Sequence, residues 1–169
     1  MERPIEVRTV RAEDASELAA LLNEIIARGG TTALEETFAA DELARGMLTG
    51  PDVICCFVAA ERATGRLVGF QSLERFEGLA DGVGDIATFT RVGLTQRGVG
   101  SRLFAATRAE AKRKGLAAIN ATIRADNAGG LAFYDRMGFV DHGVERAVPL
   151  KNGALVDRIS KRYALRPRD

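Results

Sequence analysis

One stretch decides the fold of this chain: Thr95-Gln96-Arg97-Gly98-Val99-Gly100-Ser101-Arg102-Leu103-Phe104. Residues 86–92, just before it, are rich in β-branched side chains and predict a strand. After it, apolar or small side chains recur at helical spacing, at Leu103, Phe104, Thr107 and Ala111. Two glycines, Gly98 and Gly100, therefore stand where a strand turns into a helix.

This turn predicts an anion site. The first N–H groups of a helix have no intrahelical partner and lie at the positive end of the helix dipole. Glycine lets the backbone approach a ligand closely, and Gln96, Arg97 and Arg102 add donors and positive charge. A tight turn without a ligand would carry the same two glycines, so the stretch alone leaves both interpretations open.

Two familiar phosphate loops do not fit the stretch. A P-loop places a lysine directly after its last glycine, whereas Ser101 follows Gly100 here. The dinucleotide fingerprint needs a third glycine or an alanine where this chain has Leu103. Neither motif accounts for the two glycines.

Composition and charge are those of an ordinary soluble domain. The 169 residues are 46% hydrophobic and 28% charged, and the net charge is +1, so nothing favours nucleic acid or a membrane as partner. No apolar run approaches the roughly 20 residues of a membrane span, and the start does not have the pattern of a signal peptide. We expect one cytoplasmic domain over residues 1–169.

The cysteines and the histidine predict no metal or disulfide. Cys55 and Cys56 are adjacent in an apolar, strand-like run, so their side chains should point to opposite faces as buried, reduced thiols. His142 is the only histidine, and no cluster at ligand spacing accompanies it. A redox or metal role for these residues is the less favoured alternative.

The remaining pattern predicts eleven elements in the order βααβββαβαββ. Strands are expected at 5–10, 53–61, 66–73, 86–92, 117–123, 139–148 and 155–163; helices are expected from an N-cap at Asp14 to Gly29, at 39–48, from the glycine stretch to Lys114, and at 127–137. Strand, helix, strand around Gly98 predicts a parallel crossover, and the hairpins beside it predict antiparallel pairs. The fold class is therefore α/β, a mixed sheet with helices on both faces.

A second motif follows some 27 residues after Gly100, with Asn127, Tyr134 and Gly138-Phe139 in order. Together with the glycine stretch, this spacing resembles the GNAT superfamily of acyl-CoA-dependent N-acetyltransferases, and the element order resembles that fold over nearly the whole chain. The resemblance implies a mostly antiparallel central sheet and acetyl-CoA as co-substrate, with no metal.

The resemblance also implies where coenzyme A would bind. Backbone N–H groups of residues 97–101 would hold the pyrophosphate, the strand at 88–92 would pair with the pantetheine, and Asn127 would bond to it. The expected contacts are Phe89, Thr90, Val92, Gln96, Arg97, Gly98, Val99, Gly100, Ser101, Arg102 and Asn127. One position departs from the family pattern, since Thr95 stands where Arg or Gln is usual.

Two glycines, Gly129 and Gly130, stand where a helix is expected to begin. Glycine inside a helix costs about 1 kcal/mol relative to alanine. We expect this pair to give coenzyme A close access to the backbone, unless the helix starts later, near Gly130.

The resemblance places Tyr134 near the sulfur as general acid. A tyrosine of pKa about 10 would protonate a thiolate whose thiol has pKa about 8.5, a transfer uphill by roughly 2 kcal/mol that a positioned hydrogen bond can offset. The alternative is that Tyr134 only packs a helix onto the sheet.

The attacking amine needs a base. A lysine-like amine is neutral in only about one molecule in 2,500 at pH 7, a cost of about 4.6 kcal/mol. Asp85 resembles in position an acidic residue of phosphinothricin-acetyltransferase-like members, and residues 31–38 resemble their substrate loop. We therefore expect Asp85 to be the base, and Glu35, Glu36 and Arg124 to face the substrate; the alternative is that these are solvated polar side chains.

The predicted function is transfer of an acetyl group from acetyl-CoA to a primary amine of a small molecule, such as an amino acid, by direct attack in a ternary complex. A protein or peptide N-acetyltransferase and a non-catalytic acyl-CoA sensor are the alternatives. The resemblance to the phosphinothricin group also implies a homodimer.

Overall fold

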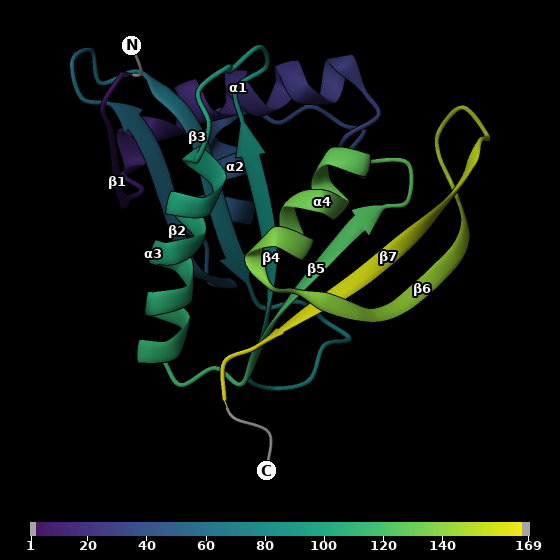
Figure 1. The fold of residues 1–169 in the computed structure, drawn as a ribbon. Coiled ribbons are helices and arrows are strands. Elements are labelled where there is room, and N and C mark those ends of the chain that lie inside the picture. Colours follow the sequence, from purple (N-terminus) through teal and green to yellow (C-terminus); the bar gives the residue numbers. More distant parts are fainter. Residues whose placement is uncertain (1–2, 167–169) are drawn as a thin grey trace.

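The computed structural model describes residues 3–166, which form a seven-stranded sheet with helices on both faces (Figure 1). The strands are β1 Ile5–Thr9, β2 Val53–Glu61, β3 Leu67–Glu74, β4 Val83–Thr90, β5 Ala118–Arg124, β6 Val140–Pro149 and β7 Leu155–Ala164. Their spatial order is β1-β2-β3-β4-β5-β7-β6. Within the described residues β4 and β5 pair in parallel and every other neighbouring pair is antiparallel. The predicted mixed sheet is confirmed.

Helices cover the sheet in two layers (Figure 1). One layer contains α1 Ala15–Arg28, preceded by the short turn η1 Ala12–Asp14, and α2 Ala40–Leu43 with its continuation η2 Ala44–Leu48. The other contains α3 Val99–Arg113 and α4 Ala128–Met137. The predicted order of helices and strands is confirmed. We call the two sides of the sheet the α1–α2 face and the α3–α4 face.

Each face has its own core. The expected stripe of α1 is buried against the sheet, with Leu18, Leu21 and Leu22 at 0% exposure. On the α3–α4 face, Phe104, Tyr134 and Phe139 pack with one another and with β5. Apolar burial of this kind is the main stabilisation of the fold.

The cysteines lie as predicted, on opposite sides of β2. Cys56 is buried in the α1–α2 core, and Cys55 packs against the α3–α4 core; both are free thiols. Burial raises the pKa of Cys55 to about 11, and a protonated thiol is a poor nucleophile.

Three local predictions differ in detail from the structure. Asp14 directly precedes α1, but its carboxylate accepts bonds from the Arg8 guanidinium and the Arg11 N–H rather than capping the helix. The helix predicted over 39–48 becomes a π-helical turn at η2, where the N–H of Thr49 bonds to the carbonyl of Ala44 at 2.8 Å. Strand β4 begins three residues before the predicted strand and ends two residues before it.

β4 and β5 separate along their length. Their pairing runs from Val83 opposite Ala118 to Ile86 opposite Ala121, although β4 continues to Thr90 and β5 to Arg124. Beyond Ile86, β4 remains bonded to β3, and beyond Ala121, β5 remains bonded to β7. The two strands diverge toward their carboxyl ends, and α4 lies across this opening (Figure 1). The opening leaves the β5-facing edge of residues 87–90 without a strand partner among the described residues.

Candidate active site

The glycine stretch forms the start of α3, as predicted. Gly98 is the N-cap with φ +86°, a left-handed conformation that favours glycine. The first helical bond runs from the Arg102 N–H to the Gly98 carbonyl at 3.1 Å, so the N–H groups of Val99, Gly100 and Ser101 precede the helical ladder. These groups and the helix dipole favour an anion.

A groove of about 590 Å³ opens at this helix start. It is lined by Thr90, Leu94, Gln96, Arg97, Gly98, Val99, Gly100, Ser101, Phe133, Arg136 and Met137. Seven of these residues were predicted as coenzyme A contacts. The three from α4 were not, because the contact between α3 and α4 depends on tertiary packing. At Gly100 an added Cβ would lie 2.8 Å from the Phe133 ring, so glycine permits this contact.

Four predicted contacts lie outside the groove lining. The Phe89 ring is buried on the α1–α2 face against Phe70, with ring centroids 5.0 Å apart. Val92 packs against that same core, and Arg102 is exposed on the first turn of α3. Asn127 is the N-cap of α4: its side-chain oxygen Oδ1 accepts the Gly130 N–H at 3.0 Å, and its side-chain amide donates to the Thr31 backbone carbonyl. Contacts of these four residues with coenzyme A stay a prediction.

The cap explains one of the two glycines at this helix start. A Cβ on Gly130 would lie 2.5 Å from the Asn127 side-chain nitrogen, so Gly130 makes room for the cap. The helix begins at Ala128, and the predicted alternative of a later start is wrong. Around Gly129 an added Cβ would meet only ordinary contacts.

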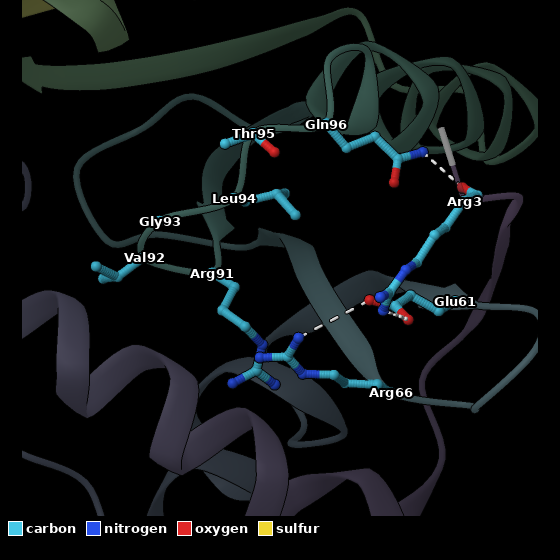
Figure 2. Close-up of a pocket in the computed structure, with 9 residues that line it drawn as sticks. All are labelled: Arg3, Glu61, Arg66, Arg91, Val92, Gly93, Leu94, Thr95 and Gln96. Carbon is cyan, nitrogen blue, oxygen red and sulfur yellow. Dashed lines mark hydrogen bonds and ion pairs between the residues drawn. The ribbon is translucent and has the colours of Figure 1, made fainter. Parts of the chain in front are cut away.

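A second hollow, of about 530 Å³, is lined by the loop at 91–96 together with Arg3, Glu61 and Arg66 (Figure 2). Its charged lining is already paired: Glu61 is bonded to Arg3 at 3.1 Å and approached by Arg66 at 3.9 Å. The Arg91 guanidinium bonds to the Leu67 carbonyl and to Glu17. The Gln96 amide donates to the Arg3 carbonyl at 2.8 Å (Figure 2). These contacts anchor the loop that borders the groove, and so we place the candidate site at the groove.

Tyr134 reaches β4 at the opening. Its hydroxyl lies 2.9 Å from the Thr88 hydroxyl, and Thr88 belongs to the part of β4 that has separated from β5. Thr88 in turn accepts the Gln71 amide N–H at 2.9 Å. Burial raises the pKa of Tyr134, while the bond to Thr88 lowers it. Gln71 was not predicted as a site residue, and Thr88 was predicted only as part of the strand that pairs with the pantetheine, without a role for its hydroxyl.

Asp85 lies on the opposite face of the same strand. Asp85 and Thr88 are three residues apart, so their side chains point to opposite faces. The Asn120 side-chain amide donates to the Asp85 carboxylate at 2.9 Å, and the Arg162 guanidinium donates to the Asn120 side-chain oxygen at 2.8 Å. Burial raises the pKa of Asp85, while the Asn120 bond and the Arg162 charge lower it. The two predicted catalytic groups therefore lie on either side of the sheet.

Glu74 is a further carboxylate that the sequence did not suggest. It stands directly opposite Asp85 in the β3–β4 register and is half-buried. Burial, followed by the negative charge of Asp85, raises the pKa of Glu74 to about 7. The position of Glu74 opposite Asp85 depends on the register of β3 and β4, which the local sequence does not specify.

The three predicted substrate-facing residues anchor the loop at 31–38. The Glu35 carboxylate accepts the Lys151 N–H at 3.1 Å, and Glu36 pairs with the Lys151 ammonium, which joins the loop to the β6–β7 turn. Arg124 donates to the Thr32 carbonyl at 3.2 Å and forms a two-bond ion pair with Asp126. Whether these side chains also contact substrate stays a prediction.

Residues 18–139 match the family model described as the acetyltransferase (GNAT) family. The match spans most of the chain, and the chain therefore belongs to this family, which confirms the resemblance and the predicted enzyme class of acetyltransferase. No curated protein matches the sequence.

Solved structures share the fold at low sequence identity. An N-acetyltransferase from Staphylococcus aureus Mu50 is 20% identical, with TM-score 0.82 over 96% of this chain and 99% of that one. A ribosomal-protein-alanine N-acetyltransferase from Brucella melitensis is 21% identical, with TM-score 0.80 over 94% and 99%. A phosphinothricin acetyltransferase from Sinorhizobium meliloti, in complex with acetyl-CoA, is 17% identical, with TM-score 0.81 over 95% and 88%.

Residues 3–166, the part of the chain that the structure describes, have neither a metal-binding cluster nor a membrane-spanning helix. They contain no group of three or more His, Cys, Asp or Glu side chains placed to hold a metal ion. Among the helices of this region, none combines the length and apolar character needed to cross a membrane.

Proposed function

We propose that this chain is a single-domain N-acetyltransferase that moves an acetyl group from acetyl-CoA to a primary amine of a small molecule. The observation that carries the proposal is the arrangement across the sheet. A phenol, Tyr134, contacts β4 at its opening, and a partly buried carboxylate, Asp85, lies on the opposite face of the same strand. Acyl transfer to an amine needs a proton donor for the leaving group and a proton acceptor for the amine.

The groove fits the acyl donor. Three N–H groups ahead of the helical ladder at α3 suit a pyrophosphate, and Gly98 and Gly100 keep that surface free of side chains. The unpaired edge of residues 87–90 offers backbone donors and acceptors to an amide-bearing pantetheine arm. When bound, acetyl-CoA would supply the thioester.

Asp85 would remove the proton from the acceptor amine on the α1–α2 face. Its raised pKa brings the carboxylate closer to neutral pH, where a general base works best. The hydrogen bond from Asn120 keeps one carboxylate oxygen oriented while the other can receive the proton. The neutral amine would then form its bond to the acetyl carbon as the carbon–sulfur bond breaks.

Tyr134 would donate its phenol proton to the departing sulfur on the α3–α4 face. The groove is lined by Phe133 and Met137, the neighbours of Tyr134 on α4, so the phenol and the groove belong to one face of the sheet. Burial makes the phenol a weaker acid than a free tyrosine, and its hydrogen bonds therefore matter to this step.

The loop at 31–38 supports a small acceptor. Contacts to the β6–β7 turn, to Arg124 and to Asn127 hold it at three places beside the α1–α2 face. A loop held in this way favours an enclosed acceptor site over an open peptide groove. The phosphinothricin acetyltransferase among the similar structures supports an amino-acid-like acceptor, whereas the ribosomal-protein acetyltransferase keeps a protein acceptor as the alternative.

The test is release of free thiol from acetyl-CoA across amino acids, polyamines and peptides. We expect turnover with at least one small amine, and Tyr134→Phe should lower it by about 100-fold while acetyl-CoA still binds, because only the donated proton is lost. Turnover with peptides alone would favour the protein acceptor. Tight acetyl-CoA binding without turnover on any amine would favour a sensor.

Asp85→Asn tests the base. The variant depends on acceptor amine that is already neutral, and that fraction falls as the pH falls. We therefore expect kcat/KM to drop most at low pH and to approach the parent value at high pH. A pH profile parallel to that of the parent would remove Asp85 from the mechanism.

A further inference from the structure

Gln71 occupies an unusual position in the middle of β3. It is completely buried, at 0% exposure, and lies in register with Thr88 on the α3–α4 face. Its amide N–H donates to the Thr88 hydroxyl at 2.9 Å, and that hydroxyl lies 2.9 Å from the Tyr134 hydroxyl. The Gln71 side-chain oxygen has no hydrogen-bond partner within residues 3–166.

One direction of the Thr88–Tyr134 bond gives each donated hydrogen of this chain of side chains an acceptor. Thr88 accepts from Gln71, and its own hydrogen then needs an acceptor. If Tyr134 donated to Thr88, the Thr88 hydrogen would lose the phenol oxygen, which is its side-chain acceptor within residues 3–166. If Thr88 donates to Tyr134, each bond of the chain runs the same way, from Gln71 through Thr88 to the phenol oxygen. The phenol hydrogen is then free.

The fold alone does not account for a glutamine here. A buried carbonyl oxygen without a partner costs free energy, and an apolar side chain of similar length would avoid that cost. Stability is often given up at a functional site in this way. At Gln71, the hydrogen bond to Thr88 is the interaction that offsets the cost of the unpaired oxygen.

We propose that Gln71 is a positioning residue, which fixes Thr88 as the donor to Tyr134 and leaves the phenol proton for the sulfur of coenzyme A. This rests on the proposed function, in which Tyr134 is the acid. As the proton moves to sulfur, negative charge develops on the phenol oxygen. The bond from Thr88 stabilises that charge, and the bond from Gln71 strengthens it through the chain.

Gln71→Met tests the proposal because it keeps length and apolar packing and removes the amide. We expect kcat to fall roughly five- to tenfold with little change in KM for acetyl-CoA, while the melting temperature stays equal or rises. A purely structural glutamine predicts a lower melting temperature and an unchanged kcat, and that result would overturn the proposal.

Thr107→Val is the matched control. The Thr107 hydroxyl on α3 is also completely buried and without a partner in the described residues. We expect the variant to retain the parent kcat and to be at least as stable. A fall in kcat equal to that of Gln71→Met would mean that any buried polar change slows the enzyme, and it too would overturn the proposal.

A double-mutant cycle shows whether Gln71 acts through Tyr134. In a Tyr134→Phe background we expect Gln71→Met to cause no further loss of kcat. A second loss of the same size would show an independent effect and overturn the proposal.

The phenol itself gives a readout that does not depend on turnover. The chain has two tyrosines, so a Tyr163→Phe variant labelled with ¹³C at the tyrosine Cζ has a single resonance, from Tyr134. We expect Gln71→Met to shift that resonance, and an unmoved resonance would overturn the hydrogen-bond chain. If the Tyr134→Phe variant turns over at the parent rate, Tyr134 is not the general acid of the proposed function. A Tyr134 resonance that is nevertheless shifted by Gln71→Met would still show that Gln71 controls the hydrogen bond to the phenol.

Discussion

At the scale of single residues, two carboxylates dominate the α1–α2 side of the site. Glu74 and Asp85 face each other across β3 and β4, and burial raises the pKa of each. Asp85 has the Asn120 amide and the Arg162 charge to stabilise its ionised form. The ionised form of Glu74 has fewer stabilising partners and is repelled by the negative charge of Asp85. Glu74 is therefore the carboxylate that stays protonated to higher pH in the folded protein.

This makes stability depend on pH through Glu74. Its pKa is about 7 in the fold, against 4.5 as the ordinary value. Because the folded state binds the proton more tightly, the stabilisation is complete below about pH 4.5 and is lost as the pH rises through about 7. We expect the parent to melt a few degrees lower at pH 8.5 than at pH 5, and Glu74→Gln to remove most of that difference.

Glu77→Gln, on the exposed loop after β3, serves as the control. It should keep the pH dependence of the parent, because it removes a carboxylate of the same type from a solvated position. A Glu74→Gln variant whose melting temperature still falls by the parent amount would contradict the burial argument. The measurement is thermal unfolding followed by circular dichroism at the two pH values.

At the scale of elements, local pattern predicted most of the fold and seven of the eleven residues that line the groove. The start of α3 follows from Gly98, whose φ of +86° is a property that sequence can indicate. The stripe of α1 follows from helical periodicity. The π-helical turn at η2 and the early start of β4 were missed, because neither is set by apolar spacing alone.

The part of the site that escaped prediction depends on register and packing. Glu74 meets Asp85, and Gln71 meets Thr88, only because β3 and β4 pair in one particular alignment. Phe133, Arg136 and Met137 line the groove only because α4 packs beside α3. The divergence of β4 from β5 is likewise a property of the sheet, and the residues at 87–90 and 122–124 carry no pattern that predicts it.

At the scale of the whole molecule, the loop at 31–38 joins three distant parts of the chain. Glu35 and Glu36 connect it to Lys151 in the β6–β7 turn, which is remote from the loop in sequence. We expect a Glu35→Ala and Glu36→Ala double variant to raise KM for the acceptor by roughly threefold, with unchanged acetyl-CoA affinity. Partial proteolysis should cleave the loop sooner, because its contacts to the turn are lost.

Glu24→Ala, an exposed change on α1, is the control for surface charge. It should leave both the acceptor KM and the cleavage rate at parent values. If the double variant also retains the parent KM and is cleaved no faster, the contacts to Lys151 do not hold the loop over the acceptor site.

The separation of β4 from β5 has a consequence for engineering. The groove and Tyr134 belong to one face of the sheet, and Asp85 with its polar neighbours belongs to the other. The two faces meet at the opening between β4 and β5 and are built from different side chains. Under the proposed function, libraries at positions such as Glu74 and Thr122 on the α1–α2 face would change acceptor choice without altering the groove proposed for the acyl donor. The sheet separates the two sets of side chains, so each set can be varied independently of the other.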